Sequence, residues 1–364
     1  MLSFLTNYIN NNNIFDENKN ILANIPEIKS KIKSQIYDKY DKYSELITTI
    51  NYFCDLYNNN NKIIVSLSGG VDSMVLTSII KYLNFEVICV YINYNNRIET
   101  KKEEEFLQKW CNYNNIKFYI ESIENIKRST LKRSEYELKS KNIRFDFYKN
   151  ILKKENVAKI FLAHHKDDII ENIFANICRG RYILDLSVMK EESIINDVCI
   201  IRPLINFYKE AIYDFALNNN VPYFKNTTPE WSVRGKYRDK IYPLLVETFS
   251  NNIKENLFNL SIQASNWNEL ITKQMIDPFM DNVIFESNNC SFNVEKYKDN
   301  PMCFWNIILM KIFYRYNKNC PSRKAINVFI NSISFKNICY ISLSDCCICY
   351  NKNFNISIRF KILI

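Results

Sequence analysis

Residues 63–73 read Ile-Ile-Val-Ser-Leu-Ser-Gly-Gly-Val-Asp-Ser, and this segment is the strongest indication of the fold. A short β-branched run predicts a strand, and the apolar-periodic segment after the Gly-Gly pair predicts a helix. The chain has only 4 glycines in 364 residues, and two of them are Gly69 and Gly70. Glycine is therefore kept where the backbone needs its conformational freedom, and these two predict a tight turn between strand and helix.

The same turn has the chemistry of a polyphosphate site. Backbone amides at Gly69 and Gly70 carry no side-chain bulk, and the positive end of the helix dipole favours an anion. The hydroxyls of Ser68 and Ser73 add hydrogen-bonding groups, and Asp72 can hold a magnesium ion that the phosphates share. No lysine follows the turn as a Walker loop would require, so this is a different phosphate loop.

The hexapeptide at residues 68–73 resembles the pyrophosphate-binding loop of the N-type ATP pyrophosphatases. These enzymes cleave ATP between the α and β phosphates and adenylate a carbonyl oxygen. The resemblance implies ATP as a substrate and Mg²⁺ as a cofactor. It assigns ATP binding to Ser68, Gly69, Gly70, Val71, Asp72 and Ser73.

Later motifs resemble one branch of this superfamily, the tRNA(Ile)-lysidine synthetases. The motifs are His-His-Lys-Asp-Asp-Ile-Ile-Glu at 164–171, Arg-Gly at 179–180, Arg-Pro-Leu at 202–204 and an Arg-rich segment at 234–245. They occur in the family's order over residues 62–245. The resemblance implies a ligase that forms a carbon-nitrogen bond: ATP adenylates the wobble cytidine of a tRNA, L-lysine is attached, and AMP and pyrophosphate are released.

The resemblance also implies roles for individual side chains. It makes Asp72, Asp168 and Glu171 catalytic, with Asp72 and Asp168 as magnesium ligands, Glu171 facing the lysine ammonium and His165 near ATP. Either His164 or His165 could instead satisfy backbone groups at the end of its strand. The residues expected to contact phosphate or the tRNA backbone are all basic: Arg97, Arg144, Arg202, Arg234, Lys236 and Arg238.

Departures from the family pattern leave further functions open. Gly235 stands where the family has asparagine, and Asn-Thr-Thr-Pro at 226–229 replaces another polar motif. A tRNA thiolation enzyme of the 2-thiocytidine or 2-thiouridine type would fit the ATP loop, but it would need persulfide or cluster cysteines. An amidating relative such as a GMP or NAD synthetase would also fit, as would a catalytically silent tRNA-binding protein.

The composition is the one expected of an intracellular protein that binds nucleic acid. The net charge of +9 and the isoelectric point near 8.8 favour a polyanionic ligand. The 12 cysteines lack the even spacing of a disulfide framework, which predicts reduced thiols and a cytoplasmic protein. No stretch approaches the roughly 18 apolar residues that cross a bilayer, so we expect no membrane association.

Along the chain, strands separated by helices predict an α/β fold. Such a chain forms a Rossmann-like parallel sheet with helices on both faces, as in the N-type ATP pyrophosphatases. The strands are expected at residues 62–68, 86–93, 117–123, 159–164 and 199–205. Ligands of such a sheet bind beyond the carboxyl ends of its strands.

Three domains are predicted from these patterns. Residues 1–61 form a polar extension with a helix over 27–57, and residues 62–245 form the catalytic domain. Residues 246–364 form a smaller helical and mixed α+β region, helical over 249–275 and 305–316 and β-rich over 337–364. By resemblance this last region contacts tRNA. Cys346, Cys347 and Cys349 lie in its alternating segment, which favours buried core positions over a metal site.

Overall fold

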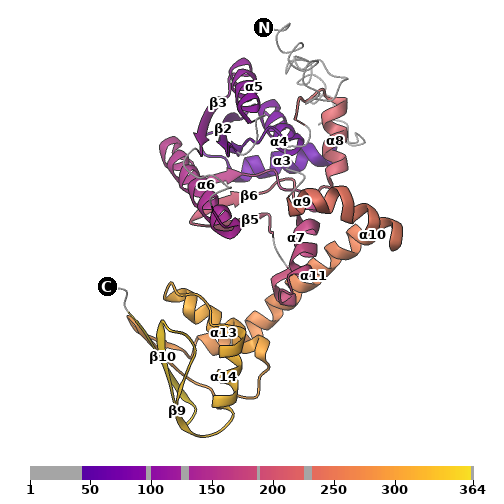
Figure 1. Ribbon diagram of the computed structural model, residues 1–364. Coiled ribbons are helices and arrows are strands. Elements are labelled where there is room, and N and C mark those ends of the chain that lie inside the picture. The colour runs from indigo at the N-terminus through magenta and orange to yellow at the C-terminus, as the bar shows by residue number, and fades with distance from the viewer. Residues whose placement is uncertain (1–42, 96–99, 124–130, 187–188, 225–231, 362–364) are drawn as a thin grey trace. The chain divides into compact units, whose positions relative to one another are not determined.

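The computed structural model describes residues 43–95, 100–123, 131–186, 189–224 and 232–361 (Figure 1). The chain divides into two compact units. Described residues within Met1–Arg179 and Val188–Asn259 form the first unit, and those within Gly180–Ser187 and Leu260–Ile364 form the second. The domain limits predicted from the sequence, after residues 61 and 245, stay predictions.

Within the described part of the first unit lies a six-stranded sheet in the order β3-β2-β1-β4-β6-β5. All neighbouring strands run parallel except β5, which is antiparallel to β6. The predicted, mostly parallel sheet is therefore confirmed. The strands are β1 (Lys62–Ser66), β2 (Glu86–Asn93), β3 (Lys117–Ser122), β4 (Lys159–Phe161), β5 (Glu192–Ile195) and β6 (Val198–Ile201).

Side chains on the strands alternate between the two faces of this sheet, as the pleat requires. On β1, Ile63 and Val65 belong to one core cluster and Ile64 to another. The first cluster includes side chains of α3 (Ser44–Tyr57), α4 (Val71–Tyr82), α5 (Thr100–Tyr113) and α8 (Lys209–Asn218). The second includes α6 (Arg133–Glu155). Helices thus cover both faces, as predicted (Figure 1).

The order of the strands creates a switch point at the centre of the sheet. From β1 the chain adds β2 and β3 on one side, and it then returns to add β4 and β6 on the other. β1 and β4 pair directly and in parallel. Their carboxyl ends lead into α4 and α7 (Lys166–Cys178), so both helices begin at the edge where ligands of such sheets bind.

Four strands, β1, β3, β4 and β6, end earlier than the pattern predicts, β6 at Ile201 rather than residue 205, and one strand of this sheet was missed. β1 ends at Ser66 and β4 at Phe161, because the chain turns away there toward the two helices. β5 forms a hairpin with β6 across Asn196 and Asp197, which have φ of 47° and 59°. Two consecutive left-handed residues are typical of a type I′ turn, so the Asn-Asp pair was the missed signal.

The predicted amino-terminal helix is confirmed over α3, and its earlier part lies outside the described residues. Ile47, Ile50 and Cys54 of α3 are buried in the same cluster as α4. After α8, the helical segments are α9 (Val233–Lys236), the π-helix η3 (Tyr237–Ile241), α10 (Tyr242–Thr248) and α11 (Ile253–Ile271). α11 confirms the helix expected over 249–275.

The second unit has its own core between helices and an antiparallel sheet. The sheet order is β7-β8-β11-β10-β9, with β7 (Ile284–Phe285), β8 (Asn289–Asn293), β9 (Ile338–Ile341), β10 (Cys347–Lys352) and β11 (Asn355–Phe360). The helical segments are η2 (Ile183–Leu186), the π-helix η4 (Thr272–Ile276), α12 (Asp277–Met280), α13 (Met302–Arg315) and α14 (Arg323–Ile333). The alternation predicted β9 to β11 correctly, whereas β7, β8 and α14 were missed.

Burial of the cysteines in the second unit confirms the core interpretation. Cys347 and Cys349 are buried in its cluster, and Cys346 is partly buried against it. All twelve cysteines are free thiols. In the described part of the chain, no helix combines the length and apolar character that crossing a membrane requires.

Substitution of Trp305 tests whether the cores of the two units unfold separately. Its ring is fully buried against Phe279, Phe304 and Phe329. We expect Trp305→Ala to lower the free energy of unfolding of the second unit by about 3–5 kcal/mol, because a large buried aromatic leaves a cavity. Urea unfolding should then show an early transition while the transition of the first unit keeps its midpoint.

Trp267→Ala is the matched control, because Trp267 is 58% exposed on α11 in the same unit. It should shift the unfolding midpoint little. An equal shift of both transitions in Trp305→Ala would show that the cores unfold as one.

Candidate active site

The loop at residues 68–73 connects β1 to α4 and is folded by its own serines. The Ser73 hydroxyl accepts a hydrogen bond from the Ser68 backbone N–H at 3.1 Å and donates to the Gly70 carbonyl at 3.0 Å. Gly70 is the N-cap of α4, and no side chain caps that helix. The first backbone N–H groups of α4 are thereby left for an anionic ligand.

Gly69 is the one position in this loop where the backbone excludes other residues. Its φ is +80°, in the left-handed region, and an added Cβ would lie 2.9 Å from Cδ2 of Phe224. The Phe224 backbone N–H also donates to the Gly69 carbonyl at 2.9 Å. Phe224, which sequence reasoning missed, therefore holds the loop from outside.

A buried histidine joins the start of α7 to the start of α4. His165 caps α7, and its backbone N–H donates to Asp168 Oδ2 at 3.1 Å. His165 Nε2 lies 3.6 Å from Asp72 Oδ1 and 3.5 Å from Asp168 Oδ2. Asp72 and Asp168, which come from different helices, therefore flank one imidazole ring that is 1% exposed.

Two lysines complete this acidic cluster. Lys209 Nζ donates to Asp72 Oδ2 at 3.2 Å, and the Lys209 backbone N–H donates to Asp167 Oδ2 at 2.8 Å. Lys254 Nζ lies 2.7 Å from Asp167 Oδ1. Neither lysine was assigned a role from the sequence, although Lys209 begins the helix after the Arg-Pro-Leu motif, and that position was the available signal.

Two arginines face the carboxylates of α7. Arg238 Nε donates to Glu171 Oε1, and Arg238 Nη2 lies 3.4 Å from Asp168 Oδ1. Arg234 lies 3.8 Å from Glu171 Oε2 and 4.0 Å from Asp168 Oδ1. Two of the predicted basic residues, Arg234 of α9 and Arg238 of η3, are thus brought together with the predicted acids Asp168 and Glu171 of α7.

The two acids respond differently to this environment. Burial favours the neutral form of Asp168, but His165, His164 and Arg234 outweigh it and lower its pKa to about 2. Burial raises the pKa of Glu171 above its ordinary value, although Arg238 and Arg234 oppose the shift. Asp168 is therefore ionised at neutral pH, whereas the carboxyl group of Glu171 needs a neighbouring cation to stay ionised.

The partly buried His164 and the buried Arg202 form a separate pair. Arg202 Nε donates to His164 Nδ1 at 3.2 Å, and its Nη1 donates to the Lys190 carbonyl and the Ser193 hydroxyl, both at 2.8 Å. Arg202 is 3% exposed. Burial, together with nearby arginines, lowers the pKa of His164 to about 4, so this imidazole is neutral at physiological pH.

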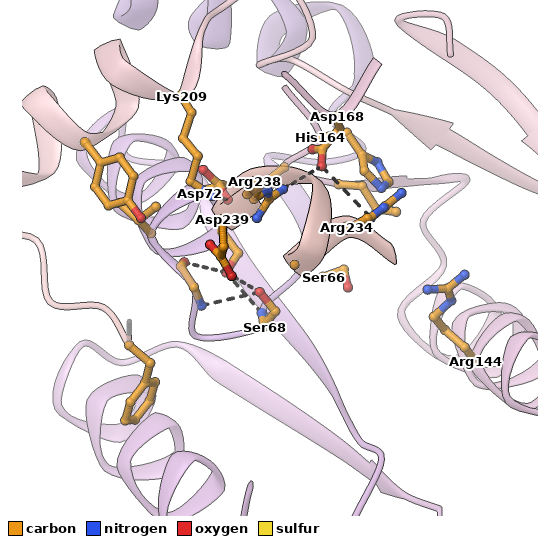
Figure 2. Close-up of a pocket in the computed structure, with 18 of the residues that line it drawn as sticks. Ser66, Ser68, Asp72, Arg144, His164, Asp168, Lys209, Arg234, Arg238 and Asp239 are labelled. Atoms are coloured by element: carbon orange, nitrogen blue, oxygen red, sulfur yellow. Dashed lines mark hydrogen bonds and ion pairs between the residues drawn. The ribbon is translucent and has the colours of Figure 1, made fainter. Parts of the chain in front are cut away.

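Several of these side chains, with Asp72, Asp168 and Arg238 among them, line a cavity of about 630 Å³ beyond the carboxyl ends of β1 and β4. Figure 2 shows Asp72, Asp168 and Arg238 in one part of the view, with Arg144 to one side. Further lining residues include Ser66, Ser68, Gly70, Val71, Ser73, Tyr148, His164, Lys209, Tyr213, Phe224, Arg234 and Asp239. The lining is mostly polar, as a charged ligand requires.

A second cavity of about 670 Å³ adjoins the first, since Arg144 and Arg234 line both. Its walls come from α6, α7 and the α9–η3 segment, and they include Glu171, Phe174 and Tyr237. Glu171 does not line the first cavity. The two arginines therefore stand between a mostly polar cavity and a more apolar one that is lined by two acidic residues, Glu137 and Glu171.

The structure places the remaining predicted residues as follows. Gly69 and His165 support the first cavity from behind its wall, as their contacts with Phe224 and Asp72 show. Arg202 is buried away from it, and Lys236 is exposed outside it. Arg97 lies outside the described residues. The roles predicted for these side chains stay predictions.

The donor set at Asp72 and Asp168 fits a hard divalent cation. Both carboxylates line the first cavity next to the phosphate loop. Asp72 Oδ1 is buried without a hydrogen-bond partner among the described residues, so it has a lone pair to offer. Carboxylate oxygens are the ligands that Mg²⁺ takes in phosphate sites.

Fold, loop and paired carboxylates define an ATP-using site of the PP-loop class. The chain belongs to the PP-loop domain family, because the family model matches residues 38–245, more than half of the chain. A PP-loop domain implies the use of ATP.

Among curated proteins, the chain is similar to tRNA(Ile)-lysidine synthase of Chlamydia caviae, at 26% identity over 69% of this chain and 79% of that protein. It is also 29% identical to the bifunctional protein TilS/HprT of Listeria innocua, over 61% of this chain and 36% of that protein. The chain thus spans about a third of the Listeria protein's length. The resemblance to lysidine synthetases seen in the motifs is confirmed.

Among solved structures, the U34-tRNA thiolase NcsA of Methanococcus maripaludis is similar, with a TM-score of 0.47 and 19% identity. That match covers 64% of this chain and 79% of the thiolase chain.

Substitution of Gly69 tests the packing of the phosphate loop. In Gly69→Ala the left-handed φ costs about 1–2 kcal/mol, and the clash with the Phe224 ring adds about 1–3 kcal/mol. We expect a loss of unfolding free energy that is the sum of both, together with a loss of ATP cleavage. Urea denaturation and AMP release measure the two effects.

Asn156→Ala is the control for this variant. Asn156 also has a left-handed φ, 55°, but it lies at the end of α6 in the same unit. Asn156→Ala should lose only the unfolding free energy that comes from the left-handed φ, and it should still cleave ATP. Equal destabilisation of the two variants would contradict the role of Phe224.

Proposed function

We propose that the chain is a tRNA-modifying ligase that adenylates the wobble cytidine of a tRNA with ATP and then attaches L-lysine to form lysidine. The observation that carries the proposal is the pair of adjoining cavities, one built on the phosphate loop and one containing Glu171. A reaction that joins a nucleotide, a base and an amine needs such neighbouring compartments. Similarity to lysidine synthases supports the same reaction.

In this proposal the ATP phosphates lie on the loop at residues 68–73. Backbone N–H groups at the start of α4 and the ammonium of Lys209 face the cavity and offset the charge that grows on departing pyrophosphate. Mg²⁺ would be held by Asp72 and Asp168. When bound there, it supplies Lewis-acid stabilisation of the phosphate oxygens.

The first step transfers the adenylyl group. The 2-oxo oxygen of cytidine forms a bond to the α phosphorus, the bond from that phosphorus to the bridging oxygen breaks, and pyrophosphate leaves. Arg234 and Arg144 line both cavities, which supports a role for them in contacting the α phosphate during the transfer. The product carries AMP on the base, which makes the ring carbon electrophilic.

The second step joins the amine. The side-chain nitrogen of lysine loses a proton, forms a bond to the electrophilic carbon, and AMP leaves with the oxygen. The second cavity is lined by two acidic residues, Glu137 and Glu171, of which Glu171 is buried and Glu137 is exposed. We assign to Glu171 the binding of the lysine ammonium before that proton is lost. Phe174 and Tyr237 line the same cavity and fit the methylene chain or the base.

Contacts with the tRNA backbone are proposed for the basic side chains around the cavities. Lys141 and Arg179 line the second cavity, and Lys236 is exposed beside it. The net charge of +9 supports a polyanionic partner.

A thiolation reaction would place a reactive cysteine next to the nucleotide. Among the described residues that line the first cavity none is a cysteine, and Cys89 and Cys111 of the same unit are buried in the core. Desolvation raises the pKa of the Cys111 thiol, which suits a structural role. Cys178 lines the second cavity but not the first, so no described cysteine that lines these cavities lies beside the phosphate loop, which favours an amine over sulfur as the nucleophile.

Incorporation of labelled lysine tests the proposed function. With ATP, Mg²⁺ and a tRNA that has a cytidine wobble base, we expect radiolabelled lysine to enter tRNA together with release of AMP and pyrophosphate. Asp72→Asn should reduce this rate by about 100-fold or more, because a group that stabilises the transition-state charge is lost. Quantitative AMP release and tRNA precipitation measure both products.

Asp55→Asn on α3 is the control, because Asp55 is an exposed carboxylate of the same unit. It should keep the native rate. ATP cleavage without lysine incorporation would contradict lysine as the nucleophile, and the absence of both would favour a silent tRNA binder.

A further inference from the structure

The ion pair between Arg238 of η3 and Glu171 of α7 engages the carboxylate that we propose as the binding group for the lysine amine. Glu171 is 4% exposed, and its Oε1 accepts a hydrogen bond from Arg238. The other oxygen, Oε2, is buried and has no hydrogen-bond partner among the described residues. In this state Glu171 holds the Arg238 guanidinium through Oε1, and Arg234 lies 3.8 Å from Oε2, so both oxygens face arginine.

A buried carboxylate needs a cation. Removing an ion from water costs several kcal/mol unless a partner of opposite charge repays it. Arg238 serves this purpose for Glu171 and also approaches Asp168, at 3.4 Å. A lysine ammonium bound to Glu171 would supply the same charge, so the guanidinium and the ammonium compete for one group.

Arg234 and Arg238 also face the first cavity, which is built on the phosphate loop. Both arginines line it, together with the loop residue Ser68 (Figure 2). Ser73 of the same loop lines it as well. A guanidinium binds phosphate through two parallel hydrogen bonds, and a triphosphate carries more charge than a single carboxylate. The phosphates of ATP, bound in the first cavity, would therefore compete with Glu171 for the guanidinium of Arg238.

We propose that Arg238 is a positioning residue that couples the two cavities: it exchanges Glu171 for the phosphates of ATP and thereby opens Glu171 to the ammonium of lysine. The inference rests on the proposed function. It makes ATP and lysine bind cooperatively, and by thermodynamic linkage each ligand raises the affinity for the other by the same factor.

Local structure singles out Arg238 over Arg234. Arg238 hydrogen bonds to Glu171, whereas Arg234 comes no closer to it than 3.8 Å. Arg238 also lies in the π-helix η3, between α9 and α10. π-helical turns are uncommon and are frequent at functional sites, where the wider turn places a side chain that a regular α-helix would point elsewhere.

The test is the affinity of the full-length chain for L-lysine with and without α,β-methylene-ATP, a nucleotide that cannot be cleaved at the α–β bond. Equilibrium dialysis with radiolabelled lysine gives the dissociation constant. We expect the analogue with Mg²⁺ to lower that constant by about tenfold, within the usual range of allosteric coupling. In Arg238→Gln the effect of the analogue should fall to less than about twofold.

Two further variants separate coupling from stability. Glu171→Gln removes the competing carboxylate, so it should bind the analogue more tightly than the native chain while losing lysine affinity; a merely structural role for the pair predicts no tighter nucleotide binding. Lys240→Gln is the matched control, since Lys240 is an exposed cation of the same π-helix outside both cavities. It should keep the native coupling.

The outcomes distinguish this inference from the function on which it rests. A lysine affinity that is equal with and without the analogue, or weaker with it, overturns the exchange even where lysine still enters tRNA. Retained coupling in Arg238→Gln also overturns it. Failure of lysine both to bind and to enter tRNA overturns the proposed function as well.

Discussion

The direct parallel pairing of β1 with β4 is the constraint on which the site depends. Because these strands are neighbours, the loop after β1 and the start of α7 open at the same edge of the sheet. His165 then fills the space between Asp72 and Asp168, and the two carboxylates approach one ring. The phosphate loop and the acidic helix are therefore one site only because the sheet reverses its order there.

Charge balance is the second organising feature. Three acidic residues at the start of α7, Asp167, Asp168 and Glu171, are wholly or partly buried, and each faces a cation from another segment. Lys254 and Arg238 come from helices that follow the sheet in sequence. The helices after residue 232 thus complete the electrostatics of the catalytic edge, rather than only connecting the two units.

Much of this arrangement follows from local sequence. The apolar runs and the two glycines indicated the strand, turn and helix of residues 62–82, and the predicted strands started within one residue of their observed first residues. The β5 hairpin and α14 were missed because their signals are weak: an Asn-Asp turn in one case and a short amphipathic segment in the other. Burial of Arg202 beside His164 had no sequence signal at all.

The phosphate loop, the acidic start of α7 and the resemblance to lysidine synthetases could all be read from the sequence, because backbone conformation and short motifs are encoded by neighbouring residues. Tertiary folding, by contrast, decided which charged side chains pair with each other. Folding paired Arg238 with Glu171, brought Lys209 to Asp72 and divided the site into two cavities. Such pairings join residues up to 137 positions apart, and their energy depends on burial that no local pattern specifies.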